Sequence, residues 1–386
     1  MRKEPYIGIV AAFIFGGIVV LGSQAYPGAT TKTQYPVGEA SATSSISVIP
    51  TLSGDTIKLE SPPPQVATTP KEQAVPSENK PALEPAATTA PKVTTTPEST
   101  PESAPIISSS LSFDSAANTL RGALVNIICY APAGSDLHSS SGSGVIIDPR
   151  GIILTNAHVA VPFLFENKGV SCIIRTGSPA HDAYTAKLMF ISPTWVSGNA
   201  VLFGTENPSG TGEYDYALLA ITGSAPSAQN ASFFPAIPLS QQVPSVGDGV
   251  AIASYAAQFL DSSQIQSGLF PTVVFGSIKD IFTFGTNSVD IVALGGSAAA
   301  QEGSSGGGVV NESGNLIGII TTSTVTGDTS TRNVNAITAP YVRRAYQSET
   351  GASFSSLVSQ NPIAAAAAFS SQIPGLEATL LANLPH

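Results

Sequence analysis

A serine in a glycine-rich stretch is the first residue of this sequence whose setting could support covalent chemistry. Ser305 lies in the run Gly-Ser-Ser-Gly-Gly-Gly at 303–308. Its glycines let the backbone turn sharply, so that adjacent N–H groups can point at a developing oxyanion. A Gly/Ser connector would have the same composition. The apolar, β-branched runs at 289–294 and 316–322 flank the stretch, however, and favour a turn within a sheet.

Two further residues could activate this serine. His158 follows the apolar run 151–155, so it lies where a strand ends, and an imidazole there can act as a general base. Asp215 directly precedes a run apolar enough to be buried, where a carboxylate needs a partner such as an imidazole N–H. Each residue alone could be structural. In the order His158, Asp215, Ser305 they predict a nucleophile with a general base and an orienting carboxylate.

Many short strands would have to position these residues. Runs rich in β-branched residues alternate with Gly, Pro, Asn and Asp, and few helical patterns lie between them. We expect strands at 124–130, 144–148, 151–155, 170–175, 186–191 and 215–222, and a second set at 249–254, 271–278, 289–294, 307–310, 316–322 and 333–338. This spacing predicts an all-β sandwich or pair of barrels, closed by a short helix at 340–347.

Four segments together resemble the trypsin/chymotrypsin-fold serine peptidases, and especially their HtrA-like (Deg) branch. They are Ser-Gly-Ser-Gly-Val-Ile-Ile at 141–147, Thr-Asn-Ala-His-Val at 155–159, Asp-Tyr-Ala-Leu-Leu at 215–219 and Gly-Ser-Ser-Gly-Gly at 303–307. The resemblance covers residues 113–348 and implies two antiparallel six-stranded β-barrels with a short C-terminal helix. Residues 349–386 are too few for a PDZ domain and are expected to form a partly ordered C-terminal tail, or else a weak helix that packs on the domain.

The resemblance implies a serine endopeptidase that acts on exported or unfolded polypeptides. Ser305 Oγ would attack a peptide carbonyl, His158 would accept its proton, and Asp215 would orient His158. The backbone N–H groups of Gly303 and Ser305 would form the oxyanion hole, and neither a metal nor an organic cofactor is needed. Members of this branch often form trimers, so a homo-oligomer is one expected assembly. The alternative is a catalytically impaired module for binding or adhesion, because fold does not determine function.

The resemblance also implies how a substrate would be selected. The base of the specificity pocket would lie six residues before the nucleophile, at Ala299, where an alanine stands on either side. This lining favours small or aliphatic side chains over Lys or Arg. Thr321, Thr322 and Ser323 would hold the substrate as an added strand through backbone hydrogen bonds.

Three features depart from the family pattern. Ser304 stands where these families commonly have Asp or Asn, so the ion pair that digestive relatives form with a newly released N-terminus is not expected. Gly308 stands where Pro is common. The interval between His158 and Asp215 is long, and residues 177–212 are rich in Gly, Ser, Asn and Pro, which predicts an extra surface loop.

The two cysteines, Cys129 and Cys172, are too few for a disulfide scaffold and lack the spacing of a zinc site. If they lie on the first and fourth strands, barrel closure makes those strands neighbours. A disulfide would then form in an oxidising compartment. Two separate buried thiols are the alternative.

The N-terminal region predicts export. Arg2 and Lys3 precede an apolar run at 6–22, a pattern that leaves the N-terminus in the cytoplasm. Residues 1–25 would form an uncleaved transmembrane anchor, or a signal peptide cleaved after Ala25. Residues 26–112, rich in Pro, Thr and Ser, predict a disordered linker or stalk. The protease domain would then be extracytoplasmic, either periplasmic or at the cell surface, and secreted if the segment is cleaved.

The charge of the chain limits its partners. Charged residues make up only 11% of the sequence, and the net charge of −10 includes no basic cluster. Nothing in this pattern could neutralise a row of phosphates, so nucleic-acid binding is not expected.

Overall fold

The computed structural model describes residues 11–12, 113–203, 209–226, 228, 233–285, 287–323 and 328–383. The expected N-terminal anchor or signal peptide and the linker at 26–112 lie outside the described residues, except for the strand β1 (Ala11–Ala12), which pairs with β7 (Ser209–Gly210). None of the helices in the described part of the chain has the length and hydropathy needed to cross a membrane.

Six antiparallel strands close into a barrel, which we call barrel 1. Their order around it is β2-β3-β4-β8-β6-β5. The strands are β2 (Leu124–Tyr130), β3 (Ser140–Asp148), β4 (Ile152–Thr155), β5 (Ser171–Gly177), β6 (Ala180–Ile191) and β8 (Ala217–Ser224). Closure comes from β2, which pairs with β3 on one side and with β5 on the other. The six strands expected in this half are confirmed, because their apolar residues fill the barrel.

A seven-stranded antiparallel sheet forms the second half, which we call sheet 2. Its order is β10-β9-β13-β14-β15-β12-β11. The strands are β9 (Gly249–Ser254), β10 (Thr272–Ser277), β11 (Asp280–Phe282), β12 (Ile291–Gly295), β13 (Gly308–Val310), β14 (Leu316–Ser323) and β15 (Val334–Thr338). The prediction of a second six-stranded barrel is confirmed only in part, because sheet 2 is a half-barrel of seven strands in which β10 and β11 remain edges. The unpredicted β11 is largely exposed and carries no buried apolar pattern.

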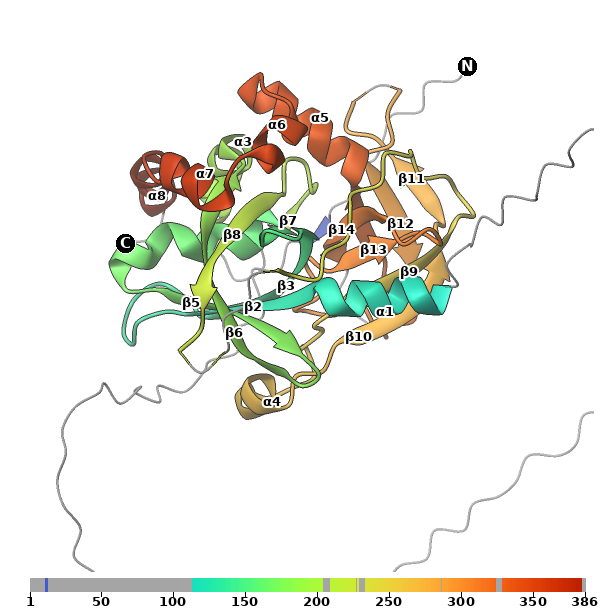
Figure 1. The fold of residues 1–386 in the computed structure, drawn as a ribbon, viewed down its shortest axis with the longest axis horizontal. Helices are drawn as coiled ribbons and strands as arrows, with labels where there is room; N and C mark the ends of the chain where they lie inside the picture. The colour runs from blue at the N-terminus through green and yellow to red at the C-terminus, as the bar shows by residue number, and fades with distance from the viewer. Residues whose placement is uncertain are drawn as a thin grey trace, which may run out of the picture. The chain divides into compact units, whose positions relative to one another are not determined.

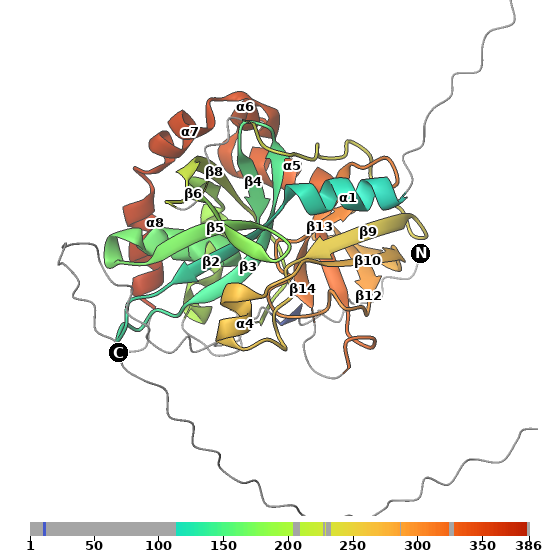
Figure 2. The ribbon, with the colours of Figure 1, turned by 60° about the horizontal axis from the view of Figure 1, so that its bottom comes forward.

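Helix α1 (Phe113–Ala123), which the sequence analysis did not predict, packs against both halves (Figure 2). Its Leu120 is fully buried. This packing gives a reason for Gly308, because a Cβ at that position would come within 2.6 Å of Leu120 Cδ1 and 2.9 Å of Val145 Cγ2. A proline ring would not fit in the same space.

The described residues between β4 and β8 form more regular secondary structure than the surface loop expected at 177–212. It contains α2 (Ala157–Ala160), the 3₁₀ segments η1 (Val161–Lys168) and η2 (Ala200–Leu202), the β5–β6 hairpin and α3 (Pro193–Asn199). Trp195 of α3 is buried. The short helix α4 (Ser262–Ser267) lies in the connection between β9 and β10.

The C-terminal region consists of helices rather than a partly ordered tail. The predicted helix is present as α5 (Ala339–Thr350), and α6 (Phe354–Ser359), α7 (Pro362–Phe369) and α8 (Ile373–Leu381) follow it. Helix α7 lies against β6 and β8 of barrel 1, where the rings of Phe369 and Phe190 have centroids 5.9 Å apart (Figure 1). Leu380 of α8 is also buried.

Candidate active site

His158 and Asp215 form a buried, hydrogen-bonded pair between the end of β4 and the start of β8. His158 lies in α2, and its Nδ1 is 2.9 Å from Asp215 Oδ2. The other carboxylate oxygen, Oδ1, accepts the backbone N–H of His158 at 3.1 Å. Because a carboxylate only accepts hydrogen bonds, Nδ1 carries the proton and Nε2 is the basic nitrogen of the ring. Both side chains are buried, so the imidazole is fixed in orientation as well as in tautomer.

Two more side chains hold Asp215. Thr321 Oγ1 donates to Asp215 Oδ2 at 2.6 Å, and Asn156 Nδ2 donates to the Asp215 carbonyl at 3.0 Å. From the sequence, Thr321 was expected to act only through its backbone, by forming hydrogen bonds with the substrate. A β-bulge between Ile320 and Thr322 sets the local register of β14, and a bulge of this kind re-aims a side chain. Because no sequence pattern marked this bulge, the role of the Thr321 hydroxyl was missed.

Ser305 lies at the turn before β13, and the backbone joins this turn to barrel 1. The Ser143 N–H donates to the Ser305 carbonyl at 2.8 Å. The Ser143 carbonyl in turn accepts the Thr155 hydroxyl at 2.7 Å, three residues before His158. Gly306 has φ +83°, and a Cβ there would overlap the Ser143 carbonyl and lie 2.5 Å from Thr155 Oγ1. The structure therefore brings the His158, Asp215 and Ser305 segments together.

The carbonyl groups of the loop around Ser305 are held by four hydrogen bonds. These are Ala257 N–H to Glu302 C=O at 2.8 Å, Ser143 Oγ–H to Gly303 C=O at 2.8 Å, Gly307 N–H to Ser304 C=O at 2.9 Å and Ser143 N–H to Ser305 C=O at 2.8 Å. In a trans peptide the N–H points away from the C=O of the same unit. The Gly303 N–H therefore points away from the Glu302 carbonyl of its own peptide, and the Ser305 N–H points away from the Ser304 carbonyl. Within the described residues neither N–H donates a hydrogen bond, as an oxyanion hole requires.

Ser304 is buried beneath this loop. Its hydroxyl accepts a hydrogen bond from Ser254 Oγ at 3.0 Å. At this position, where digestive relatives form an ion pair with a newly released N-terminus, the chain has a neutral hydrogen bond between two serine hydroxyls.

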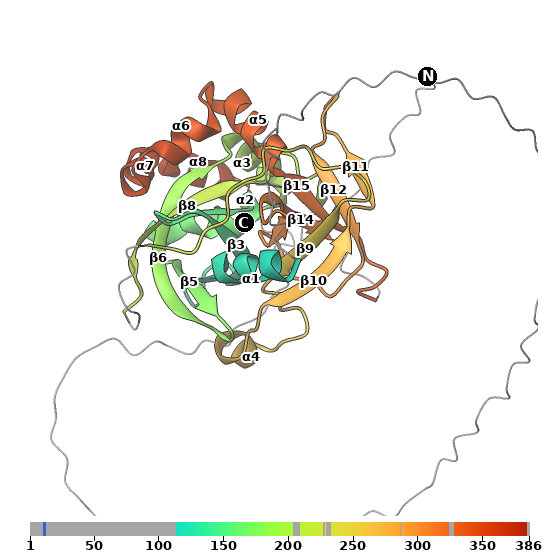
Figure 3. The same ribbon diagram turned by 45° about the vertical axis from the view of Figure 1, so that its right-hand side comes forward.

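Residues 255–269 form hydrogen bonds both with the loop around Ser305 and with the β5–β6 hairpin of barrel 1. Arg175, which is buried, donates from Nη1 to Ile265 C=O at 2.8 Å and from Nη2 to Gln266 C=O at 2.5 Å. Burial raises the pKa of Tyr255 to about 12, so its hydroxyl stays protonated and donates to Gly177 C=O at 2.8 Å. Helix α4 accordingly lies beside the ends of β5 and β6 (Figure 3). Arg175 and Tyr255 had no sequence signal beyond their residue types.

Residues 142–319 match the family model described as the trypsin-like peptidase domain. This stretch of the chain is thus similar to trypsin-like peptidases. The resemblance drawn from the sequence is confirmed for this family. The segments around His158, Asp215 and Ser305 all fall within the matched residues, whereas α1 and α5 to α8 lie outside them.

Two solved structures are similar to the chain. One is a serine endoprotease from Yersinia pestis, with 22% identity, a TM-score of 0.40 and coverage of 61% of this chain. The chain spans 66% of the length of that structure. The other is an inactive form of a serine-to-alanine mutant of Rv3671c from Mycobacterium tuberculosis, with 15% identity, a TM-score of 0.39 and coverage of 66% of this chain and 97% of the other. No curated protein matches the chain.

The expected substrate-binding residues lie close to the Ser305 loop in the sequence. Ala299 is fully buried, and Thr321 is buried beside Asp215. Thr322 and Ser323 continue β14 and pair with Asn335 and Val334 of β15. Their roles in binding a substrate stay predictions. Among the described residues, no group of three or more His, Cys, Asp or Glu side chains could hold a metal ion.

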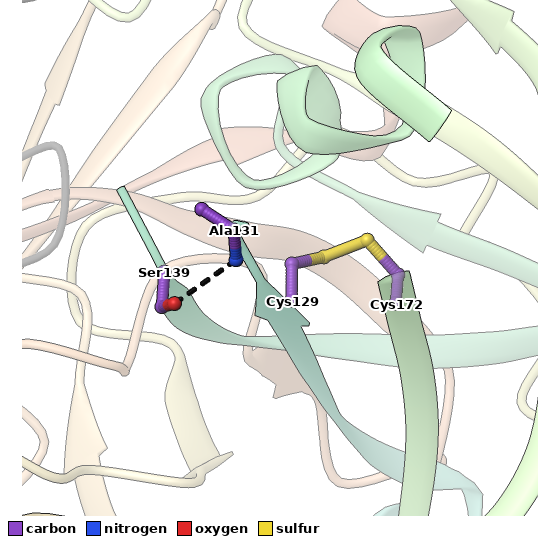
Figure 4. The surroundings of a disulfide bond; sticks show 4 residues. All are labelled: Cys129, Ala131, Ser139 and Cys172. Carbon is purple, nitrogen blue, oxygen red and sulfur yellow. Dashed lines mark hydrogen bonds between the residues drawn. A yellow bond between two sulfur atoms is a disulfide. The ribbon is translucent and has the colours of Figure 1, made fainter. Parts of the chain in front are cut away.

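Cys129 and Cys172 are joined by a disulfide across the seam that closes barrel 1 (Figure 4). The two residues are directly paired in the β2–β5 register, with Cα atoms 4.0 Å apart. Ser139 Oγ accepts the N–H of Ala131 at 3.0 Å nearby. The disulfide therefore links two strands of barrel 1 that are far from Ser305 in the sequence.

Proposed function

We propose that the chain is a serine endopeptidase that acts through His158, Asp215 and Ser305. The observation that carries this proposal is the combination of a buried His158–Asp215 pair with a loop that leaves the Gly303 and Ser305 N–H groups without an acceptor among the described residues. The pair supplies a base of fixed tautomer, and the loop supplies donors for a developing negative charge.

The reaction follows from these roles. Ser305 Oγ attacks the peptide carbonyl as His158 Nε2 takes its proton, and the carbonyl oxygen becomes an oxyanion bound by the Gly303 and Ser305 N–H groups. His158 then gives the proton to the leaving amine, and the C–N bond breaks to leave an acyl ester on Ser305. A water molecule, deprotonated by His158, hydrolyses the ester and restores the serine. Asp215 stabilises the imidazolium in each step without taking a proton.

The proposed substrates are extended segments of exported or unfolded polypeptides. They would add as a strand alongside Thr321, Thr322 and Ser323, and the buried Ala299 favours a small or aliphatic side chain before the cleaved bond. We further propose that the enzyme is of the HtrA-like type. A homo-oligomer remains one expected assembly.

We also propose an extracytoplasmic location with a membrane tether at the N-terminus. The disulfide supports an oxidising compartment, since such bonds are rare in the cytosol of most cells. The basic N-terminus followed by the apolar run at 6–22 supports export. A proteolysis assay on cells with a permeabilised outer envelope and an intact cytoplasmic membrane, with the chain tagged at its C-terminus, would test this: loss of the tag is expected, and full protection would contradict it.

The alternative, a protease-fold module for binding or adhesion, is not favoured. Such a module has no need for Thr321 to hold Asp215 or for Asp215 to hold His158. Labelling with a fluorophosphonate probe separates the two functions, because the probe reacts only with an activated serine.

The experiment compares the full chain with its Ser305→Ala and Ser304→Ala variants. We expect labelling and cleavage of fluorescent denatured casein in wild type, retention of labelling in Ser304→Ala, and loss of both activities in Ser305→Ala. A peptide library would then show cleavage after Ala, Val or similar residues. Absence of Ser305-dependent labelling in folded wild-type protein would reject the proposed function, and cleavage after Lys or Arg would reject the proposed specificity.

A further inference from the structure

Ser143 lies on β3 of barrel 1, yet it contacts the Ser305 loop of sheet 2 through both its main chain and its side chain. Its N–H donates to the Ser305 carbonyl at 2.8 Å. Its hydroxyl donates to the Gly303 carbonyl at 2.8 Å and accepts the Tyr255 N–H at 2.9 Å. The residue is fully buried. The Ser143 hydroxyl thus uses its donor and one acceptor position within the protein.

These bonds close a ring around the peptide that would supply one oxyanion-hole donor. Tyr255, held by the Ser143 hydroxyl, lies two residues before Ala257, whose N–H holds the Glu302 carbonyl. The next carbonyl of the loop, that of Gly303, returns to the Ser143 hydroxyl. The Ser143 hydroxyl therefore fixes the Gly303–Ser304 peptide directly, and it also holds Tyr255 in the segment whose Ala257 N–H fixes the Glu302–Gly303 peptide.

The conformation of Gly303 makes this restraint necessary. Its φ is +85°, and a Cβ at this position would come within 2.7 Å of the Tyr255 carbonyl. Glycine has little intrinsic preference between positive and negative φ. Contacts with the surrounding protein must therefore select the orientation in which the Gly303 N–H points away from Ala257.

We propose that Ser143 is a positioning residue that orients the Gly303 N–H for oxyanion binding. This inference rests on the proposed peptidase function and assigns Ser143 no contact with the substrate. Without the hydroxyl, the Gly303 carbonyl and the Tyr255 N–H lose their partner, and the Gly303–Ser304 peptide keeps only the hydrogen bond from its N–H to the Gln301 carbonyl. The donor is then misplaced when the oxyanion forms, although the substrate still binds.

The test measures kcat and KM for a fluorogenic peptide with Ala before the cleaved bond, and inhibition by the matching peptide aldehyde. It uses the full chain as wild type, Ser143→Ala, Ser143→Cys and Ser141→Ala. Ser141 is a matched control on the same strand, where its hydroxyl accepts a hydrogen bond from Asn126 Nδ2 at 2.9 Å rather than bonding to the loop. Thermal unfolding of every variant determines how much of each sample is folded.

For Ser143→Ala we expect kcat to fall about 10- to 100-fold with KM within about twofold, since loss of a whole oxyanion-hole donor costs about 10²- to 10³-fold. The aldehyde, which forms a tetrahedral adduct, should bind more weakly by a similar factor. Ser143→Cys retains a weak donor and acceptor and should lie between wild type and Ser143→Ala. Ser141→Ala should retain the wild-type kcat.

Each outcome decides the inference. If folded Ser143→Ala keeps its kcat and its aldehyde affinity, Ser143 is not a positioning residue. If Ser143→Ala does not fold, the kcat-against-KM comparison for Ser143→Cys decides in its place, and an unchanged kcat rejects the inference. If wild type shows no Ser305-dependent labelling, the proposed function fails and this inference fails with it. Labelled wild type with an unaffected Ser143→Ala overturns only the inference.

Discussion

The two halves of the candidate active site are held by different kinds of hydrogen bond. On the barrel 1 side, side chains hold side chains: His158 contacts the Asp215 carboxylate, and so does Thr321, which reaches it from β14 of sheet 2. In sheet 2, the Ser305 loop is held mainly by hydrogen bonds to its backbone carbonyl groups. These bonds fix the backbone conformation of the loop rather than the positions of its side chains. The first half should therefore be sensitive to changes of a few atoms in a side chain. The second should be sensitive to changes that prevent the backbone from adopting its conformation.

The largest effect on the side-chain half is expected for Asp215→Asn. An amide can donate to Nδ1 and so favours the wrong imidazole tautomer, which should lower kcat by about 10⁴-fold with the fold intact. Steady-state kinetics and thermal unfolding check this, with Asp280→Asn on the exposed strand β11 as the matched control. A kcat within about tenfold of wild type would contradict the proposed orienting role.

The matching change in the backbone half is Gly306→Ala. The added methyl group would overlap the Ser143 carbonyl at a φ of +83°, so the loop must move. We expect kcat to fall by about 100-fold or more and the free energy of unfolding to fall by about 2 kcal/mol or more. Gly276→Ala on β10, where a Cβ would meet no atom within 4 Å, is the control. Equal effects of the two variants would show that the loop shape is not critical.

Thr321→Val tests how much the second hydrogen bond to Asp215 contributes. Valine keeps the shape of threonine but removes the hydroxyl from a buried carboxylate, where such a bond contributes about 1.5 to 3 kcal/mol. If the transition state loses this stabilisation, the activation free energy rises by the same amount and kcat should fall about 10- to 100-fold. Thr321→Ser keeps the hydroxyl and should stay within a few-fold of wild type. Equal kcat values for the two variants would assign Thr321 a packing role only.

Removal of the disulfide should affect stability without affecting either half of the site. For Cys129→Ser combined with Cys172→Ser, the sequence separation of 43 residues predicts a loss of about 4 kcal/mol in the free energy of unfolding. Urea unfolding measures this loss, and kcat in the absence of urea should stay within about twofold of wild type. A reductant should destabilise wild type to the same extent. A large fall in kcat in folded protein would instead link the β2–β5 seam to the site.

The smallest effect is expected at the β3–β4 turn, away from both halves. The hydrogen bond from the Arg150 side chain lowers the pKa of Asp148 in the folded protein. A carboxyl group with a lowered folded pKa stabilises the fold above its ordinary pKa of about 4, and this contribution is lost as the pH falls through the folded value. Because Arg150 is largely exposed, Asp148→Asn should cost only about 0.5 to 1 kcal/mol at pH 7.

That difference between Asp148→Asn and wild type should shrink below about pH 4. Thermal unfolding from pH 2 to 8 tests this, with Asp136→Asn in an exposed turn as the control for loss of charge. If the difference in stability between Asp148→Asn and wild type does not depend on pH, the charge of Asp148 does not contribute to the stability of the fold.

Sequence alone was sufficient for the strands and for the order of His158, Asp215 and Ser305, because apolar runs and turn residues carry those signals locally. It was insufficient for α7, whose Ala-rich run does not reveal a buried face, and for the exposed strand β11. It also missed Ser143 and the Thr321 hydroxyl. Those side chains depend on how β3 and a bulged β14 are placed in space, and neither placement is encoded in local residue patterns.

The helices α7 and α8 also affect how barrel 1 can fold. The strands of this barrel are complete at Ser224, yet the helix that packs against β6 and β8 is synthesised only after all of sheet 2. Until α7 arrives, the face of barrel 1 that it covers, including Phe190, remains open to solvent. A chain that is still being translated, or one cut after α5, therefore exposes an apolar surface that favours aggregation or binding by chaperones.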